Sequence, residues 1–213
     1  MTDPAGLRRA YERAELDESS LAATWHEQLL TWFSQAVTDL GDLEANAIQL
    51  ATVDDGGLPQ VRTVLAKGID EHGVTFFTNY ESAKARDLDA RPFASIVFLW
   101  QAHERQVRLS GPVSRASAAE TAEYFATRPR GSQLGAWASP QSRVLGSRVE
   151  LEELLSAVEQ RFADGPIPAP PHWGGYRLAP VSVEFWQGRP DRLHDRLRFR
   201  LAEGLWVVER LAP

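Results

Sequence analysis

Hydrophobic positions follow two different periods along the chain. From Ser19 to Leu40, apolar side chains recur every three or four residues, which places them on one face of an α-helix, and Gly41 ends the pattern. Further on, alternating positions and short apolar runs bounded by Gly- and Pro-containing turns are typical of β-strands. We therefore predict a helix over residues 19–40, followed by a body rich in strands.

The strand pattern predicts a single α+β domain. The expected strand segments are residues 47–54, 60–70, 74–79, 93–101, 105–116, 176–188, 191–201 and 204–213. Mostly antiparallel strands with a few helices indicate a closed or half-closed β-barrel. We expect this domain to cover residues 19–213, and the polar, charged residues 1–18 to form an N-terminal arm that is extended or partly mobile.

Two Ser-x-x-Glu capping motifs predict further helices. The motif at 117–120 opens a helix to about residue 128, and the motif at 147–150 opens another to about residue 162. A buried stripe on the second helix is expected from Leu151, Leu154, Leu155, Val158 and Phe162. Residues 128–143 between the helices are rich in Gly, Ser and Pro, so we expect a loop, and a loop of this length in a compact domain is more often functional than idle.

Composition excludes several kinds of functional site and partner. The 213 residues include no cysteine, which excludes disulfides, thiolate nucleophiles and zinc–sulfur or iron–sulfur sites, and the five histidines show no metal-ligand spacing. A net charge of −6 argues against nucleic acid as a partner. The longest apolar run, residues 93–100, is too short to span a bilayer, and the first residues lack the apolar core of a signal peptide. We predict a cytoplasmic protein with a small soluble ligand, no metal and no membrane contact.

Basic and polar residues inside apolar strands form the first candidate site. No dinucleotide-binding, P-loop or nucleophile-elbow motif is present. Arg62 and Lys67 lie in one expected strand, where alternation puts them on opposite faces, and Gln106 lies near the start of another. Lys84 starts a short helix expected over 81–90, where free N–H groups and the positive dipole end suit a phosphate. Taken singly, each residue is more typical of a surface side chain.

A second candidate cluster lies at the end of the 117–128 helix. Tyr124 and Arg128 are four residues apart and therefore neighbours on one helix face, and Ser132 follows them. Together these side chains suit a phosphate clamp. A polar helix end with an arginine in its last turn explains the same spacing equally well.

Arginines alternate in "DRLHDRLRFRL", residues 191–201. If this segment is a strand, one face carries Arg192, His194, Arg196, Arg198 and Arg200. One interpretation is an edge strand that charge keeps from aggregating. The other is a row of donors that faces an anionic ligand, because the guanidinium fork fits phosphate and carboxylate.

Several longer motifs carry a resemblance to a known family. They are "ERQVR" (104–108), "RPRGSQLGAWAS" (128–139), "WGGYR" (173–177), "EFWQG" (184–188), "RLHDR" (192–196) and "RLAP" (210–213). With these motifs the chain resembles the FMN-dependent pyridoxine (pyridoxamine) 5′-phosphate oxidase family over nearly its whole length. The resemblance implies a split-barrel FMN-binding fold, mainly an antiparallel β-barrel with flanking helices, and a homodimer with FMN at the subunit interface.

The resemblance also implies site residues, position by position. Implied FMN contacts are Arg62, Thr63, Val64, Leu65, Ala66, Lys67, Phe77, Thr78, Lys84, Gln106, Gln141, Ser142, Trp186 and Arg196. Implied substrate contacts are Arg8, Arg9, Tyr11, Lys67, Tyr124, Arg128, Ser132, Arg192, Leu193 and His194. Of these, Arg192 and His194 are the implied catalytic residues. The resemblance is silent on Arg198 and Arg200, which keep the charged-edge interpretation, and Ala83 stands where the family usually has an arginine.

The implied activity is FMN-dependent oxidation of pyridoxamine 5′-phosphate or pyridoxine 5′-phosphate to pyridoxal 5′-phosphate, with O₂ as electron acceptor and H₂O₂ as by-product. Two alternatives remain open. One is a flavin oxidase of another pathway on the same scaffold, such as a phenazine-type enzyme, which need not keep the residues of the Tyr124 cluster. The other is a non-catalytic protein that binds flavin or pyridoxal phosphate.

Overall fold

The computed structural model describes residues 11–40 and 44–213. Its helices are α1 (Trp25–Leu40), α2 (Ala83–Ala90), α3 (Ala118–Thr127), α4 (Arg130–Ala138) and α5 (Arg148–Phe162). Its strands are β1 (Ala47–Val53), β2 (Pro59–Asp70), β3 (Gly73–Asn79), β4 (Phe93–Trp100), β5 (Arg105–Arg115), β6 (Trp173–Leu178), β7 (Ser182–Gln187), β8 (Asp195–Ala202) and β9 (Leu205–Arg210). None of the helices in these ranges has both the length and the apolar composition needed to cross a membrane.

Six of the strands close into an antiparallel barrel. Neighbours pair in the order β4-β1-β2-β3-β6-β5, and β5 pairs again with β4 to complete the ring. The apolar side chains of these strands alternate inward and are buried, as the sequence pattern requires. The structure therefore confirms the predicted α+β fold with a mainly antiparallel barrel and flanking helices.

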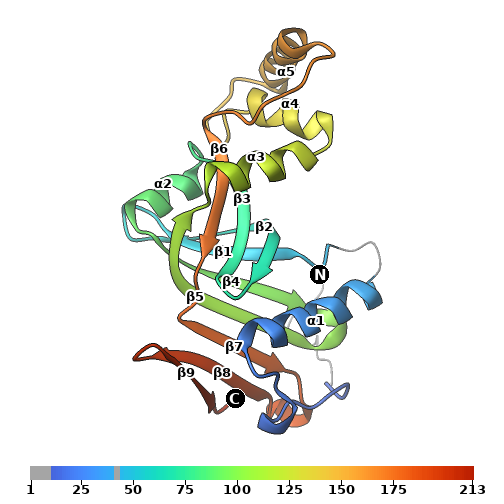
Figure 1. Cartoon of the computed structure of the whole chain (residues 1–213), viewed down its shortest axis with the longest axis vertical. Coiled ribbons are helices and arrows are strands. Elements are labelled where there is room, and N and C mark those ends of the chain that lie inside the picture. The colour runs from blue at the N-terminus through green and yellow to red at the C-terminus, as the bar shows by residue number, and fades with distance from the viewer. Residues whose placement is uncertain (1–10, 41–43) are drawn as a thin grey trace, which may run out of the picture.

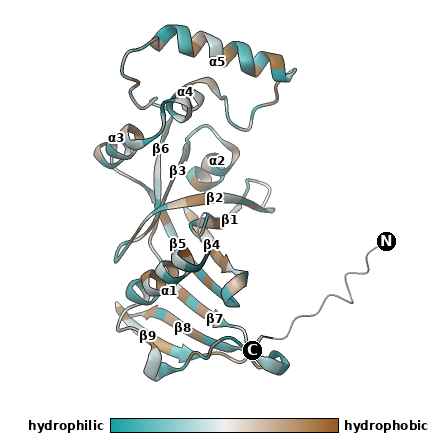
Figure 2. Ribbon diagram, turned by 90° about the vertical axis from the view of Figure 1, so that its right-hand side faces the viewer, coloured by the Kyte–Doolittle hydropathy of each residue, from teal (hydrophilic) through white to brown (hydrophobic). Residues whose placement is uncertain are grey.

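Strand β5 joins this barrel to a second sheet. Its residues 105–110 pair with β7, whereas residues 113–115 pair with β6. Beyond β7 the sheet continues through β8 to β9, at the opposite end of the molecule from α3, α4 and α5 (Figure 1). In Figure 2, hydrophobic and hydrophilic positions alternate along the strands of this sheet, and the buried face packs under α1 through contacts such as Trp32 on Phe185.

Helix α1 begins at Trp25, six residues later than predicted. Asp17 caps a short 3₁₀ turn over Glu18–Ser20. Thr24 and Glu27 then exchange hydrogen bonds between side chain and backbone at the start of the helix. Of the apolar stripe that was predicted from spacing, Trp25, Leu29, Trp32 and Ala36 are buried and Phe33 is partly buried. Gly41, the expected stop, lies outside the described residues.

The expected loop over 128–143 was wrong, because residues Arg130–Ala138 form helix α4. Pro129 stands at the helix N-cap, and Leu134 and Ala138 are buried one turn apart. The predicted helix after Ser147 is present, but the expected buried stripe is not. Residues on α5 are at most partly buried, and Leu155, Val158 and Phe162 pack on a small cluster that also includes Phe125 and Trp173.

The predicted arginine strand was partly wrong. A 3₁₀ turn covers Pro190–Arg192, in which Asp191 and Arg192 have positive φ angles of 55° and 63°, and strand β8 begins only at Asp195. Left-handed backbone at two successive residues ends the alternation that the sequence suggests.

The charged-edge interpretation was also wrong. Strand β8 lies between β7 and β9, so it is not an edge strand. Arg198 and Arg200 each hold one oxygen of Glu209 on β9, both at 2.6 Å. These arginines therefore cross-link two strands of the second sheet.

Candidate functional site

The barrel opens between β2 and β3, and a cavity lies in the opening. The two strands pair only from Ala66 and Phe76 toward the turn that joins them. Beyond that point β2 stays with β1, while residues 77–79 of β3 stay with β6. The resulting cavity has a volume of about 670 Å³. On the cavity side, the 62–65 segment of β2 has no strand partner within the described chain, so its outward backbone groups are free for a ligand.

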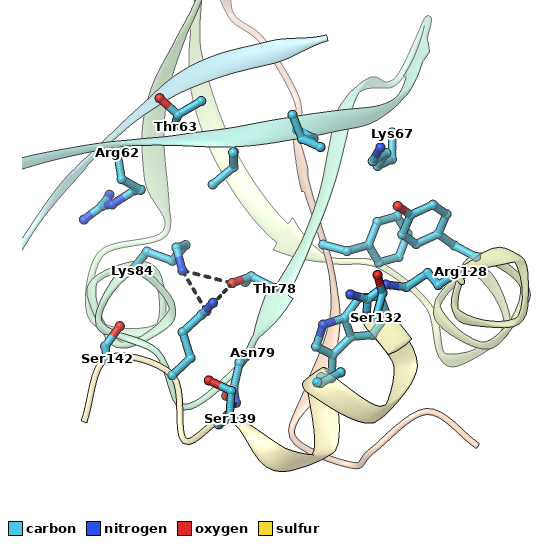
Figure 3. Close-up of a pocket in the computed structure, with 18 of the residues that line it drawn as sticks. Arg62, Thr63, Lys67, Thr78, Asn79, Lys84, Arg128, Ser132, Ser139 and Ser142 are labelled. Carbon is cyan, nitrogen blue, oxygen red and sulfur yellow. Dashed lines mark hydrogen bonds between the residues drawn. The ribbon is translucent and has the colours of Figure 1, made fainter. Parts of the chain in front are cut away.

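One end of the cavity carries Arg62 and Lys84 (Figure 3). Arg62 donates hydrogen bonds to Thr52 Oγ1 at 2.6 Å and to Asp87 at 3.4 Å. Thr52 in turn donates to the same Asp87 oxygen at 2.6 Å, and that carboxylate is buried. The guanidinium of Arg62 is thus oriented by β1 and α2, and its pair with Asp87 leaves other N–H groups for an anion.

Lys84 is held in a cage of neutral acceptors. Its ammonium donates to Thr78 Oγ1 at 3.0 Å, Ser82 Oγ at 3.2 Å and Gln141 Oε1 at 2.9 Å. Only 9% of the residue is exposed. Burial, together with the nearby Arg62 charge, lowers the pKa of Lys84 to about 8. An anion bound beside it would restore the charged form.

The other end of the cavity carries Lys67, Arg128 and Ser132 (Figure 3). The guanidinium of Arg128 lies 4.6 Å above the ring of Trp173. Its Nη1 atom is buried and makes no hydrogen bond within the described residues. Burial also lowers the pKa of Arg128. A buried, unsatisfied N–H on a partly buried guanidinium is an indication of an anionic ligand.

Three nearly parallel aromatic rings support this second end. Phe77 stacks on Tyr124 with ring centroids 4.1 Å apart and on Trp173 at 5.5 Å. The sequence placed Tyr124 here, but the positioning role of Trp173 beneath Arg128 was missed. Its only signal was the motif "WGGYR", in which Gly174 leaves room for the ring of Tyr80.

A β-bulge explains why Arg62 and Lys67 line one cavity although alternation puts them on opposite faces. The pairing of β2 with β3 shifts between Ala66 and Gly68, so Lys67 is the extra residue. The cavity also lies along the unpaired edge of β2, so side chains from both faces of this strand line it. Within the cavity, Arg62 and Lys67 lie at opposite ends (Figure 3).

A second group of implied site residues lies on the second sheet. Strand register places Trp186 directly between Gln106 on β5 and Arg196 on β8. Arg196 donates to Glu184 at 2.8 Å and to the carbonyl of Ala212 at 2.7 Å, so the C-terminal "RLAP" motif helps to fix it. A smaller cavity of about 350 Å³ is lined by residues of this group, Gln106 and Trp186 among them.

The arm and the 189–194 turn meet over this second group. The ring of Tyr11 lies 5.8 Å from both Trp186 and His194, and His194 lies 4.5 Å from Trp186. Backbone amides of Glu12 and Arg13 donate to Glu104, which holds the arm down. Burial and the neighbouring Arg192 charge lower the pKa of His194.

The implied site residues therefore form two groups in one chain. The large cavity is lined by Arg62, Thr63, Val64, Leu65, Lys67, Phe77, Thr78, Lys84, Tyr124, Arg128, Ser132, Gln141 and Ser142. The second group is Tyr11, Gln106, Trp186, Arg192, His194 and Arg196. Ala66 is brought into neither, because it is buried in the core, and Leu193 is 71% exposed on the turn. Arg8 and Arg9 lie outside the described residues.

Family models match most of the chain. Residues 35–162 match the model described as pyridoxamine 5′-phosphate oxidase. Residues 173–213 match the model described as pyridoxine 5′-phosphate oxidase C-terminal dimerisation region.

Curated relatives and solved structures agree with this match. The chain is 63% identical over 208 residues to the pyridoxine/pyridoxamine 5′-phosphate oxidase of Saccharopolyspora erythraea, covering 97% of this chain and 94% of the relative. It is 54% identical over 210 residues to the enzyme of the same name from Azotobacter vinelandii, with 98% of each chain covered. The crystal structure of PhzG from Burkholderia lata, in complex with tetrahydrophenazine-1-carboxylic acid, superposes with a TM-score of 0.81 at 27% identity, covering 91% of this chain and 98% of PhzG.

Proposed function

The chain belongs to the pyridoxamine 5′-phosphate oxidase family of oxidoreductases, and we propose that it oxidises pyridoxamine or pyridoxine 5′-phosphate to pyridoxal 5′-phosphate with bound FMN. O₂ is the proposed electron acceptor. The alcohol and O₂ then give aldehyde and H₂O₂, while the amine also consumes water and releases ammonia. The observation that carries the proposal is one cavity with a cationic group at each end, since both the cofactor and the substrate carry a phosphate.

The residues present fit FMN at the Arg62 end of the cavity. Arg62 and Lys84 supply charged donors, the start of α2 supplies free N–H groups, and the unpaired edge of β2 supplies backbone groups along the opening. A bound flavin would supply two-electron acceptance from the substrate and reoxidation by O₂. The chain's own contribution is to fix the two phosphates and to exclude water.

The substrate phosphate is proposed at the opposite end. The unsatisfied N–H group of Arg128, with Lys67, Tyr124 and Ser132 beside it, suits a second phosphate. A phosphate held far from the reacting carbon supplies binding energy that aligns the rest of the substrate.

A homodimer completes the proposed site. The second group, around Trp186 and Arg196, lies in or beside the segment that matches the dimerisation model. We propose that this group of one protomer faces the large cavity of its partner, and two-fold symmetry then requires the reverse as well. FMN is therefore proposed at the interface. The cytoplasmic location expected from the sequence stays a prediction.

Peroxide production tests the proposal. FMN-loaded protein should release H₂O₂ on addition of pyridoxamine 5′-phosphate and far less on addition of pyridoxamine, which lacks the phosphate. Peroxide only with tetrahydrophenazine-1-carboxylic acid would favour the phenazine-type alternative, to which the likeness to PhzG points. Bound flavin without peroxide from any of these compounds would favour a binding protein.

A further inference from the structure

The ring of His194 accepts a hydrogen bond from the backbone. The amide N–H of Arg189 points at its Nδ1 atom at a distance of 3.1 Å. Because a backbone amide can only donate, Nδ1 must present its lone pair. The proton of the neutral ring is then on Nε2.

The turn between the two residues enforces this contact. Pro190–Arg192 form a 3₁₀ turn in which Asp191 and Arg192 adopt left-handed backbone angles. Non-glycine residues take up such angles at a cost, and they persist where the surroundings require them. The ring of His194 is further confined by Trp186 and Tyr11, so it has little freedom to turn away from Arg189.

The carboxylate next to His194 is already engaged. Asp195 accepts the amide of Leu16 at 3.2 Å and pairs with Arg210 at 2.8 Å and with Arg189 at 3.6 Å. In a Ser-His-Asp triad, the histidine that acts as general base donates its Nδ1 proton to a carboxylate and keeps Nε2 as the acceptor. In this chain the arrangement is the reverse, because Nδ1 receives a proton donor.

We propose that His194 acts as a neutral hydrogen-bond donor, through Nε2–H, to an acceptor atom of the substrate, and that it takes up no proton during the oxidation. The assignment of a substrate rests on the proposed function. Within the part of the chain that the structure describes, the ring's hydrogen bond is made at Nδ1 and none is made at Nε2, so the Nε2–H group is available. Burial and the positive charge of Arg192 also oppose an imidazolium at this place.

The tautomer can be measured without any turnover. In the dimer labelled with ¹⁵N-histidine, His194→Gln identifies the signals of His194, and the exposed His72 gives a reference ring. At neutral pH the proposal requires an unprotonated Nδ1 and a protonated Nε2. A neutral His194 ring with its proton on Nδ1 would overturn the proposal, even if the protein is an active oxidase.

Two substitutions test the role in turnover. Glutamine places an amide N–H near the position of Nε2 but takes up no proton, whereas alanine does neither. We expect His194→Gln to lose less than about tenfold in kcat, the scale of a distorted hydrogen bond, and His194→Ala to lose clearly more. If His194 were a general base, both variants should lose about 100-fold or more in kcat, since neither glutamine nor alanine takes up a proton. Equal losses of that size would overturn the proposal. His72→Gln is the matched control, and a wild-type protein without turnover would count against the proposed function while leaving the tautomer measurable.

Discussion

The ammonium of Lys84 donates a hydrogen bond of 2.9 Å to the side-chain oxygen of Gln141. This contact ties the start of α2 to the segment that follows α4, two parts of the chain that the sequence separates by 57 residues. The lysine is buried there with a pKa of about 8, so its charge changes within an accessible pH range.

FMN affinity should therefore fall as the pH rises above about 8. In the free protein Lys84 loses its proton near pH 8, while a bound phosphate dianion raises its pKa, so binding takes up a proton. Titration of apoprotein with FMN should show a Kd that is nearly constant from pH 6.5 to 7.5 and rises roughly tenfold per unit above 8. Lys84→Met should bind more weakly at pH 7 and lose this dependence. A wild-type Kd that is flat from pH 7 to 9 contradicts the prediction.

Ala83→Arg should tighten FMN binding. Ala83 lines the cavity. It stands at the position where, by the resemblance described above, the family usually has an arginine. Arg86 does not replace it, because Arg86 donates to the carbonyl of Glu81 and does not line the cavity. A new charged contact of about 1.4 kcal/mol gives up to roughly tenfold in Kd, and salt should reduce the gain. Ala83→Met is the control for added bulk, and an equal gain from methionine would show that charge is not the cause.

Arg128→Ala should raise the KM for the phosphorylated substrate at least tenfold while the flavin spectrum stays unchanged. A charge-assisted hydrogen bond contributes about 1.5–3 kcal/mol, and Arg128 lies at the end of the cavity away from Arg62. Arg130→Ala is a matched control, because Arg130 is exposed and bonds the carbonyls of Ala163 and Gly165. Loss of FMN from the Arg128 variant would show that Arg128 binds the phosphate of FMN and not that of the substrate.

Arg192→Ala should lower turnover more than it lowers stability. Arg192 is on the turn beside His194 and belongs to no buried cluster, so its loss removes little packing. Arg198→Ala should instead leave kcat almost unchanged, since Arg198 is paired with Glu209. The comparison needs kcat and the thermal midpoint of both variants. Equal losses of activity would contradict the distinction between the turn and the strand.

Gly188→Ala should displace the arm without unfolding the protein. A Cβ atom at Gly188 would lie 2.7 Å from the ring of Tyr11, closer than such contacts allow. Limited proteolysis should cut the arm faster in this variant, and the KM should rise. In a Tyr11→Gly background the same substitution should add little, because both the ring and the Cβ atom that it meets are gone. If the effects of the two substitutions on KM were fully additive, the effect of Gly188→Ala would not arise from contact with Tyr11.

The sequence predicted the elements whose pattern is local. Alternation identified β1, β2, β4 and β5 to within a residue or two, and the serine caps identified α3 and α5. Helix α4 was missed because two glycines and a serine made residues 130–135 read as loop, although burial of Leu134 and Ala138 stabilises a helix there. Alternation also continued through residues 191–194, where positive φ angles break the strand.

In the candidate site, too, the sequence predicted the contacts that depend on local spacing and missed those that depend on the fold. Spacing brought Tyr124 and Arg128 together, because Tyr124 lies in the last turn of α3 and Arg128 is the C-cap residue of that helix. The row from Gln106 through Trp186 to Arg196 depends on strand register across three strands, which no local pattern carries. The tautomer of His194 depends on a backbone amide five residues away, so only coordinates could give it.

Strand β6 has a consequence for how the chain can be divided. It belongs to the C-terminal segment that matches the dimerisation model, yet it is the strand that fills the gap between β3 and β5. A fragment that ended near residue 165 would have a barrel with an open seam, and a fragment that began there would carry three further strands, β7 to β9, without α1 to cover them. Neither piece would contain a complete core. The boundary between the two family models therefore cuts through the barrel, and we expect the smallest unit that folds to span both models.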